Sequence, residues 1–206
     1  MTTNYGTTSS RMERKKEDTR QRIIEVAAAL FRQHGFEATT MEQVAVSADV
    51  AKGTLYNYFP IKEAILVGYI QRSFQQKNPQ RLAGLKEYPD TRSRLAAILG
   101  DLMAGVLAQP EIFEKFLIYR VKCVMSLYKN ENVKGGMEEL ASVIIHIGRE
   151  NGEIRTDLPD GVLEEYFEFV FVEAAKQYYK NPEEFVLYET IDRSVDLFLQ
   201  GAGTTG

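Results

Sequence analysis

The outer face of a short helix predicted at residues 51–59 carries the side chains best suited to bind a hydrogen-bonding ligand. In the stretch AKGTLYNYF, Ala51, Leu55 and Phe59 recur every four residues, which is the spacing of one helical face. The opposite face can donate hydrogen bonds to phosphate oxygens and base edges, so the pattern favours a helix that enters the major groove of DNA. The residues at these polar positions are Lys52, Gly53, Thr54, Tyr56 and Asn57.

Two short helices joined by a tight turn would hold that face rigidly. Thr40 and Gln43 form a capping box at the start of the preceding helix, and Asp49 tolerates the left-handed backbone that a tight break needs. Gly53 leaves room for close approach to a groove, although glycine lowers helix stability by up to ~1 kcal/mol relative to alanine. This order of elements predicts a helix-turn-helix. The alternative is an ordinary pair of core helices with exposed tyrosines.

Positive charge is concentrated just before this region, at residues 11–22. The segment holds six basic and three acidic residues, which leaves a surplus of three positive charges. One interpretation is a solvated helix start. The other is an N-terminal arm that makes weak contacts with DNA phosphates.

The composition is that of a soluble globular protein and offers few groups for catalysis. Of 206 residues, 44% are hydrophobic and 26% are charged, and the net charge is −4. One cysteine, Cys123, cannot form an internal disulfide, the apolar runs are too short to span a bilayer, and no secretory signal is visible. We therefore expect a cytoplasmic protein without membrane contact. The two histidines lie far apart, and no CxxC, HExxH or phosphate-binding glycine loop occurs, so we expect no enzyme activity, metal or cofactor.

Helical periodicity extends along almost the whole chain and predicts an all-α protein with about nine helices. We expect a disordered arm at residues 1–13, a helix-turn-helix module at residues 14–61 and a larger helical body at residues 62–206. The first helix of that body is predicted to end near Lys77, because prolines at positions 79 and 89 indicate a loop or a broken helix.

The N-terminal sequence resembles the DNA-binding region of the tetracycline-repressor (TetR) family of bacterial transcription regulators. The resemblance covers residues 19–66 and rests on AAALF…HGFEATTM, VAVSADVAKGTLYNYF and KEAIL, in order and at the family's spacing. It implies a homodimeric repressor whose helix-turn-helix modules bind a palindromic operator. It further implies that residues 62–206 bind an unknown small molecule that weakens DNA binding. The alternative is a DNA-binding protein of the same fold without an inducer, acting through a protein partner or on chromosome organisation.

The resemblance also assigns roles to single residues. Lys52, Gly53 and Thr54 match positions where the family reads bases or neighbouring phosphates, whereas Thr40 and Lys62 match its phosphate clamps. Asn57 matches a variable position that can reach DNA, and the aromatic positions that contact phosphate or position the helix are Tyr56 and Tyr58.

Three positions depart from the family pattern around the second and third helices. Ala51 replaces a frequent serine or threonine cap, which costs about 0.5–2 kcal/mol of helix stability. Asp49 stands where glycine is common, and Ile61 replaces the usual serine or asparagine that caps the following helix. None of these substitutions removes a DNA-contacting group.

The two C-terminal helices are apolar over much of their circumference, which favours a subunit interface. We predict a four-helix bundle with two helices from each chain; the alternative is that these helices complete the core of a single chain. The predicted interface residues are Leu163, Tyr166, Phe167, Val170, Ala174, Ile191, Val195 and Phe198.

An interior rich in aromatic residues and methionine could form the effector pocket, although such residues more often form only a core. His146 is more simply a buried, hydrogen-bonded histidine, and Lys176 offers Glu173 a partner one turn away. The candidate lining residues are Phe74, Met103, Phe116, Tyr119, Cys123, Met125, His146, Phe169 and Glu173.

Overall fold

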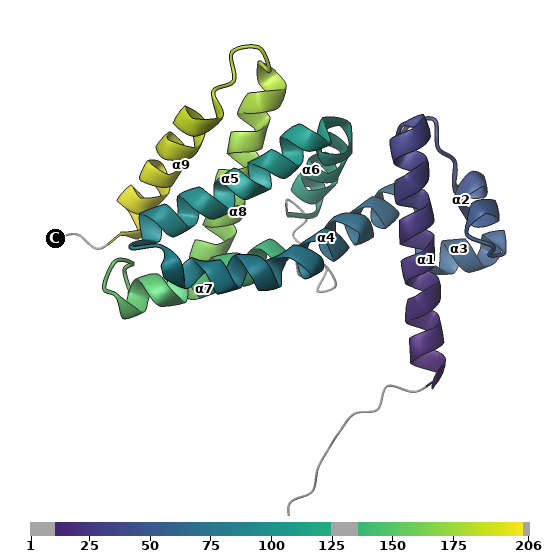
Figure 1. The fold of residues 1–206 in the computed structure, drawn as a ribbon, viewed down its shortest axis with the longest axis horizontal. Helices are drawn as coiled ribbons and strands as arrows, with labels where there is room; N and C mark the ends of the chain where they lie inside the picture. Colours follow the sequence, from purple (N-terminus) through teal and green to yellow (C-terminus); the bar gives the residue numbers. More distant parts are fainter. Residues whose placement is uncertain (1–10, 125–135, 204–206) are drawn as a thin grey trace, which may run out of the picture. The chain divides into compact units, whose positions relative to one another are not determined.

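The computed structural model describes residues 11–124 and 136–203, and it is all-α, as the sequence predicts (Figure 1). Nine α-helices and one short 3-10 helix occur in this part of the chain, and the sole β-type pairing found there is a bridge between Ile154 and Gly203. The elements are α1 (Arg11–His34), α2 (Met41–Ser47), α3 (Lys52–Tyr58), α4 (Lys62–Gly84), η1 (Leu85–Glu87), α5 (Thr91–Ala108), α6 (Pro110–Val124), α7 (Gly136–Glu150), α8 (Asp160–Lys180) and α9 (Leu187–Ala202).

The chain divides into two compact units, residues 1–70 and 71–206. The division falls inside helix α4, nine residues after the predicted boundary between residues 61 and 62. The N-terminal unit contains α1, α2, α3 and the first turns of α4. The predicted disordered arm is wrong for residues 11–13, which are helical, and its remainder lies outside the described residues.

The core of the N-terminal unit is formed by one apolar face from each of its helices. Ile23 of α1, Leu55 of α3 and Ile65 of α4 are all 0% exposed. Helix α1 ends at His34 because Gly35 adopts a left-handed conformation, with φ of 83°, that side chains rarely permit. This core fixes the positions of the two short helices.

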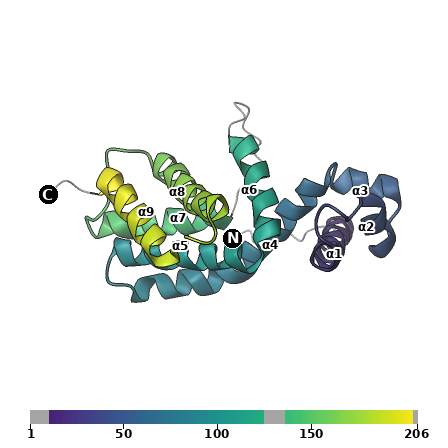
Figure 2. The same ribbon diagram turned by 90° about the horizontal axis from the view of Figure 1, so that it is seen from above.

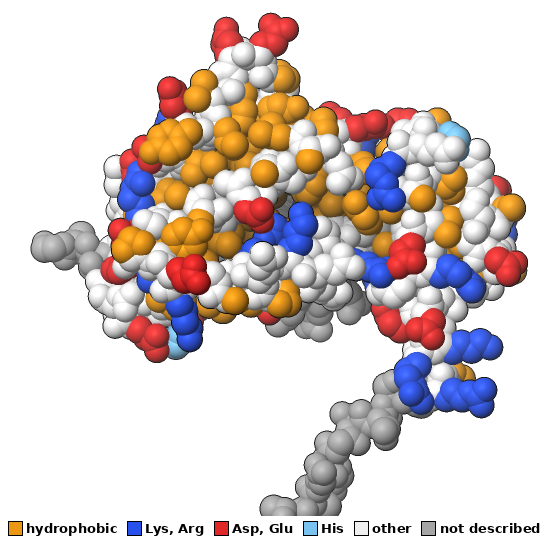
Figure 3. Space-filling view, viewed as in Figure 1, with side chains coloured by type: hydrophobic (Ala, Val, Ile, Leu, Met, Phe, Trp, Pro, Cys, Tyr) orange, Lys and Arg blue, Asp and Glu red, His pale blue; other side chains and the backbone are white. Residues whose placement is uncertain are grey.

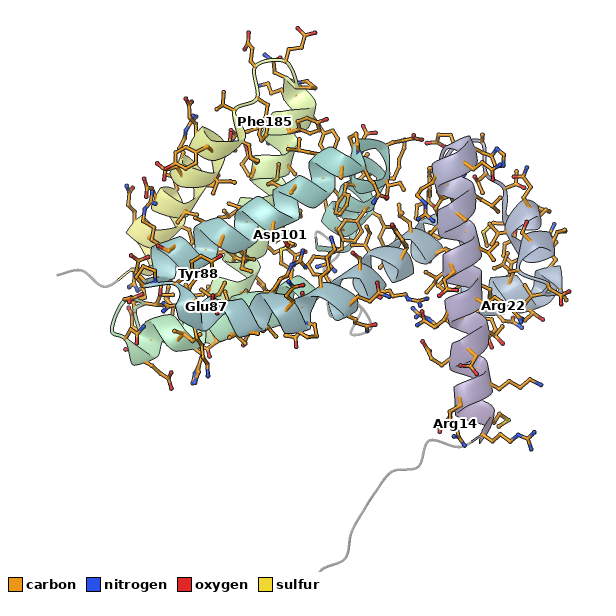
Figure 4. The ribbon with its side chains drawn as sticks, in the orientation of Figure 1. Arg14, Arg22, Glu87, Tyr88, Asp101 and Phe185 are labelled. Carbon is orange, nitrogen blue, oxygen red and sulfur yellow. The ribbon has the colours of Figure 1, made fainter. Side chains whose placement is uncertain are left out.

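Helix α4 continues through Pro79 to Gly84, so the predicted break near Lys77 is wrong. Proline removes one backbone donor and disturbs one turn, but contacts within the C-terminal unit hold the helix on either side. The buried Asn78 amide donates to the Gly136 carbonyl at 2.8 Å, and the Arg81 guanidinium donates from Nε to Asp101 at 2.6 Å. Figure 4 shows Asp101 on the side of α5 that looks toward α4.

The C-terminal unit is built around helix α5, which contacts α7, α8 and α9 (Figure 2). Its inner residues Leu95, Leu99 and Met103 are at most 1% exposed. Phe167 of α8 and Phe198 of α9 meet edge to face, with their ring centroids 6.0 Å apart. These aromatic and aliphatic side chains form one continuous core within a single chain.

No single described helix is long and apolar enough to cross a membrane. Only α5 together with α6 as far as Val121 would have the necessary length and composition, and these two helices meet at a bend of 116°.

Candidate nucleic-acid interface

Helix α2 begins with the capping box that the sequence predicts. The Gln43 backbone N–H donates to Thr40 Oγ1 at 3.1 Å, and the Thr40 backbone N–H donates to Gln43 Oε1 at 2.8 Å. Thr40 is exposed, and its hydroxyl retains a hydrogen that can be donated to a ligand. The capping box therefore fixes the direction of α2 and leaves Thr40 available at its N-terminus.

A tight turn at Asp49 leads from α2 into α3. Asp49 has a φ of 51°, which confirms the left-handed conformation expected there, and the Val50 N–H donates to the Ala45 carbonyl at 3.0 Å. Ala51 is the N-cap residue of α3 and provides no side-chain hydrogen bond. The weak cap predicted from the sequence is therefore present, and burial of Leu55 and Phe59 holds the helix.

The outer face of α3 is exposed and lies open around Gly53. Lys52, Gly53, Tyr56 and Asn57 are exposed, and Thr54 is half-buried beside them. A Cβ atom added to Gly53 would meet nothing within 4 Å, so packing inside the described chain does not require glycine at this position. An external surface that approaches the backbone closely would require it.

An ion pair links Lys52 on this face to Glu42 on α2. The Lys52 Nζ lies 2.5 Å from Glu42 Oε1 and 5.9 Å from the centroid of the Tyr56 ring. The hydrogen bond from Lys52 lowers the pKa of Glu42, and the same bond raises the pKa of Lys52, so both groups are charged at neutral pH. Glu42 thus offsets the charge of Lys52. This ion pair joins α2 and α3, and helical periodicity in the sequence could not predict it.

Lys62 occupies a different environment from that of an exposed phosphate clamp. Its ammonium donates to the backbone carbonyls of Phe36 at 2.6 Å, Thr39 at 2.8 Å and Glu37 at 3.2 Å, which uses all three of its hydrogens. The ammonium also lies 4.5 Å from the centroid of the Phe36 ring. Phosphate contact by Lys62 stays a prediction, while the geometry gives this side chain a positioning role at the α1–α2 connection.

Tyr58, the remaining predicted DNA-contacting residue, is half-buried at the end of α3. The structure therefore places seven of the predicted positions on α3 and in the residue before α2, whereas the Lys62 ammonium is bound by the connection between α1 and α2. Those seven are Thr40, Lys52, Gly53, Thr54, Tyr56, Asn57 and Tyr58.

The predicted effector-pocket residues do not form one group. Phe74, Met103 and Phe116 are buried, and Tyr119 is half-buried. Met125 and the side chain of Cys123 lie outside the described part of the chain. The buried members belong to the apolar interior of the C-terminal unit, whereas His146, Phe169 and Glu173 do not.

His146, Phe169 and Glu173 are exposed, so their assignment to a pocket interior is wrong. The side chain of His146 is 72% exposed and lies 3.3 Å from Glu150, because Ile144 and Ile145 define the buried face of α7. Glu173 pairs with Lys176 at 3.0 Å, the plainer partner suggested by the sequence. Among the described residues, no group of three or more His, Cys, Asp or Glu residues could hold a metal ion.

Most of the predicted dimer-interface residues are used inside the chain itself. Tyr166 is exposed and Val170 is half-buried, but the other six form part of the C-terminal core, so the assignment of these six to a subunit surface is wrong. The apolar side chains that reach the surface of α8 and α9 include Phe169, which is 52% exposed, and Leu197, which is 66% exposed. Figure 3 shows hydrophobic side chains over α9 and the adjoining part of α5. The six buried residues are Leu163, Phe167, Ala174, Ile191, Val195 and Phe198.

Comparison with known proteins finds a family match over the region that contains the candidate interface. Residues 23–68 match the model of the family described as bacterial regulatory proteins, tetR family. The HTH-type transcriptional repressor KstR of Rhodococcus jostii (strain RHA1) is 44% identical over 69 residues, which are 31% of this chain and 32% of KstR. The chain thus spans about a third of the length of that relative.

Two further proteins are similar over a larger part of the chain. The fatty acid metabolism regulator protein of Bacillus subtilis (strain 168) is 26% identical over 153 residues, which are 70% of this chain and 75% of that protein. The crystal structure of Thermus thermophilus FadR, a TetR-family transcriptional repressor in complex with lauroyl-CoA, aligns with a TM-score of 0.73 and 22% sequence identity. That alignment covers 88% of this chain and 94% of the FadR chain, and it shows a shared fold.

Replacing Lys62 by methionine tests its positioning role. Methionine keeps the length of the side chain but removes the donors to three carbonyls, so we expect Lys62→Met to lower the free energy of unfolding by about 1.5–3 kcal/mol. Chemical denaturation measures this loss. The matched control is Lys77→Met, which replaces an exposed lysine on the same helix and is expected to change little. Equal stabilities of the two variants would contradict the role assigned to Lys62.

Proposed function

We propose that this chain, which belongs to the tetR family of bacterial regulatory proteins, is a transcriptional repressor that a small molecule releases from its DNA operator. The observation that carries the proposal is the outer face of α3. An exposed glycine with open space around it is flanked by hydrogen-bond donors, while Leu55 on the inner face is completely buried. A rigid helix with an accessible polar face is what readout in the major groove requires.

The charges on this face favour base and phosphate contacts that rely on hydrogen bonds more than on net charge. Glu42 neutralises much of the charge of Lys52, so the Tyr56 hydroxyl, the Asn57 amide and the Thr54 hydroxyl supply the remaining donors. Hydrogen bonds to base edges discriminate sequences, whereas cations bind every sequence alike. We therefore infer that α3 contributes more to specificity than to affinity.

We propose that the protein binds a palindromic operator as a homodimer, because α3 alone is a short helix for base recognition in the major groove. One seven-residue helix contacts only a few base pairs, and two copies related by a two-fold axis would double the site. The exposed side chains of Tyr166, Phe169 and Leu197 supply an apolar surface on α8 and α9 that a second copy could cover. We propose these residues as part of the interface, in place of the six residues buried in the core.

An acyl-CoA thioester is the effector class that we propose. Thermus thermophilus FadR shares the fold and was crystallised with lauroyl-CoA. In this chain the C-terminal unit has an interior of large, adaptable apolar side chains, among them Phe74, Met103 and Phe116, which suits a long acyl chain. The protein would act in the cytoplasm, where both the operator and the thioester occur.

Thr54→Ala tests the reading face on an operator obtained by in vitro selection with the wild-type protein. Loss of one hydroxyl contact is expected to weaken operator binding by about 1 kcal/mol, roughly fivefold, and to relax base preference at one position in each half-site. Fluorescence anisotropy against the operator and its single-base variants measures both effects. Thr156→Ala, which changes an exposed threonine of the C-terminal unit, is the control. A Thr54→Ala variant that behaves as wild type would exclude Thr54 from the interface.

Phe169→Glu tests the proposed subunit interface. A charge placed in an apolar contact must be desolvated without a partner, so we expect the variant to sediment as a monomer at concentrations where wild type is a dimer. Operator affinity should fall in parallel. Ile118→Glu, on α6, alters a side chain of similar exposure, 47% against 52% for Phe169, and serves as the control. A wild-type monomer, or a dimer that tolerates Phe169→Glu, would contradict the assignment.

Lauroyl-CoA and stearoyl-CoA test the effector class. A ligand at a hundred times its Kd stabilises the folded state by about 2.7 kcal/mol, which raises Tm by roughly 5–11 °C in a chain of this size. We expect this shift, together with loss of operator binding, with either thioester and not with coenzyme A alone. Flat melting curves with thioesters, drug-like cations and aromatic acids would favour a repressor without an inducer.

A further inference from the structure

The N-terminal turns of helix α1 project beyond the packed module. Every residue from Arg11 to Asp18 is exposed, and the first buried residue of the helix is Ile23. Eight helical residues correspond to roughly 12 Å of helix. Figure 1 shows these turns extending past α3 on the side away from α2. They do not contribute to the core, so their sequence is not constrained by packing.

Four cations on these turns form no ion pair with any residue that the structure describes. In the part of the chain that the structure describes, no carboxylate lies within 4.0 Å of Arg11, Arg14, Lys15 or Lys16. Figure 3 shows Lys and Arg side chains gathered at this end of α1, where Figure 4 labels Arg14. Elsewhere in the described chain carboxylates pair with many of the cations, including Lys52, Arg81, Arg92, Arg94, Arg120, Arg149, Arg155 and Lys176.

This concentration of positive charge destabilises the isolated helix. Cations near a helix N-terminus oppose the macrodipole, and Arg11 and Lys15, four residues apart, repel each other on one side of α1. Glu13 is the sole acidic residue among positions 11–16. Because ion pairs within the described part of the chain do not offset the cost, an external polyanion is the group that would stabilise this segment.

DNA bound to α3 would be the polyanion nearest to these cations, because the projecting turns of α1 and helix α3 belong to the same compact unit. The four side chains are long, exposed and not fixed by packing, so they suit point charges on a phosphate backbone better than the defined geometry of base edges. The segment offers few apolar groups for a membrane: Met12 is its one large hydrophobic side chain. The charges therefore match a nucleic-acid backbone more closely than a lipid surface.

We propose that Arg11, Arg14, Lys15 and Lys16 on the N-terminal turns of α1 form a second, sequence-independent contact with the phosphate backbone of bound DNA. This inference rests on the proposed function. In this proposal α3 contacts the bases and α1 contacts the phosphates. The cations of α1 provide the positive charge that Lys52 cannot provide, because Glu42 neutralises it. Counterion release upon phosphate contact would then make α1 a major source of the salt dependence of binding.

The test compares two fourfold variants of the full chain that remove the same charge. In the α1 variant all four cations become glutamine, which keeps the helix propensity high. The control variant replaces four exposed cations of the C-terminal unit that have no ion pair in the described chain. The substitutions are Arg11→Gln, Arg14→Gln, Lys15→Gln and Lys16→Gln in the first variant, and Lys77→Gln, Lys86→Gln, Lys180→Gln and Arg193→Gln in the second.

The readout is the slope of log affinity against log salt concentration for the selected operator and for unrelated DNA of equal length. Each lost phosphate contact lowers the magnitude of the slope by about 0.9, so we expect the α1 variant to lose roughly 1.8–3.6 per subunit. The ratio of operator to unrelated-DNA affinity should stay as in wild type. A variant with Arg11→Lys and Arg14→Lys keeps the charges and should keep the wild-type slope.

Four outcomes would overturn the inference. An α1 variant with the slope of wild type, at an unchanged Tm, would show that these cations do not touch DNA, although the proposed function would stand. An altered base preference would show that they read sequence. Loss of binding to vesicles of phosphatidylglycerol and phosphatidylcholine, with an unchanged DNA slope, would assign them to a membrane. A wild-type protein that binds no DNA would overturn the proposed function as well.

Discussion

The proposed interface depends on the burial of Leu55 and Phe59, because helix α3 has little else to stabilise it. Seven residues are too few for an isolated helix in water. The glycine at position 53 costs up to ~1 kcal/mol and the missing cap at Ala51 costs about 0.5–2 kcal/mol. Leu55 and Phe59 are 0% and 3% exposed, and burying each side chain is worth about 1.5–3 kcal/mol. The inner face therefore offsets the weakness of the outer one, which is free to carry residues suited to binding.

Features set by neighbouring residues could be predicted from the sequence, and features set by distant residues could not. The capping box at Thr40, the left-handed Asp49 and the uncapped Ala51 each depend on residues at most three positions away. The three carbonyls that hold the Lys62 ammonium lie 23 to 26 residues earlier in the chain, and no local pattern indicates them. The exposure of His146 could not be predicted for a related reason: isoleucines flank it on both sides, so the apolar run does not indicate which face of α7 is buried.

The apolar stripes on α8 and α9 predict that these residues are buried, but they do not indicate whether the same chain or a second subunit covers them. Phe167 and Phe198 are covered by each other and by the rest of the C-terminal unit, which the sequence could not distinguish from cover by a second subunit. Phe169 lies two residues beyond Phe167 and is exposed, since successive helical positions point in different directions. An interface is therefore better inferred from apolar residues that remain exposed after folding than from the strongest stripe in the sequence.

Helix α4 is the element through which the proposed effector could influence the proposed DNA-binding face, since one continuous helix belongs to both units. At its start, Lys62 holds the carbonyls of the α1–α2 connection; further along, Asn78 and Arg81 are held by α7 and α5. An effector can weaken operator binding only to the extent that it prefers a state with lower DNA affinity. A ligand that changed the surroundings of Asn78 or Arg81 would bias the position of α4, and the three hydrogen bonds of Lys62 would carry that bias to the connection between α1 and α2. The Lys62 hydrogen bonds that stabilise the helix-turn-helix would then also transmit the change that releases it from DNA.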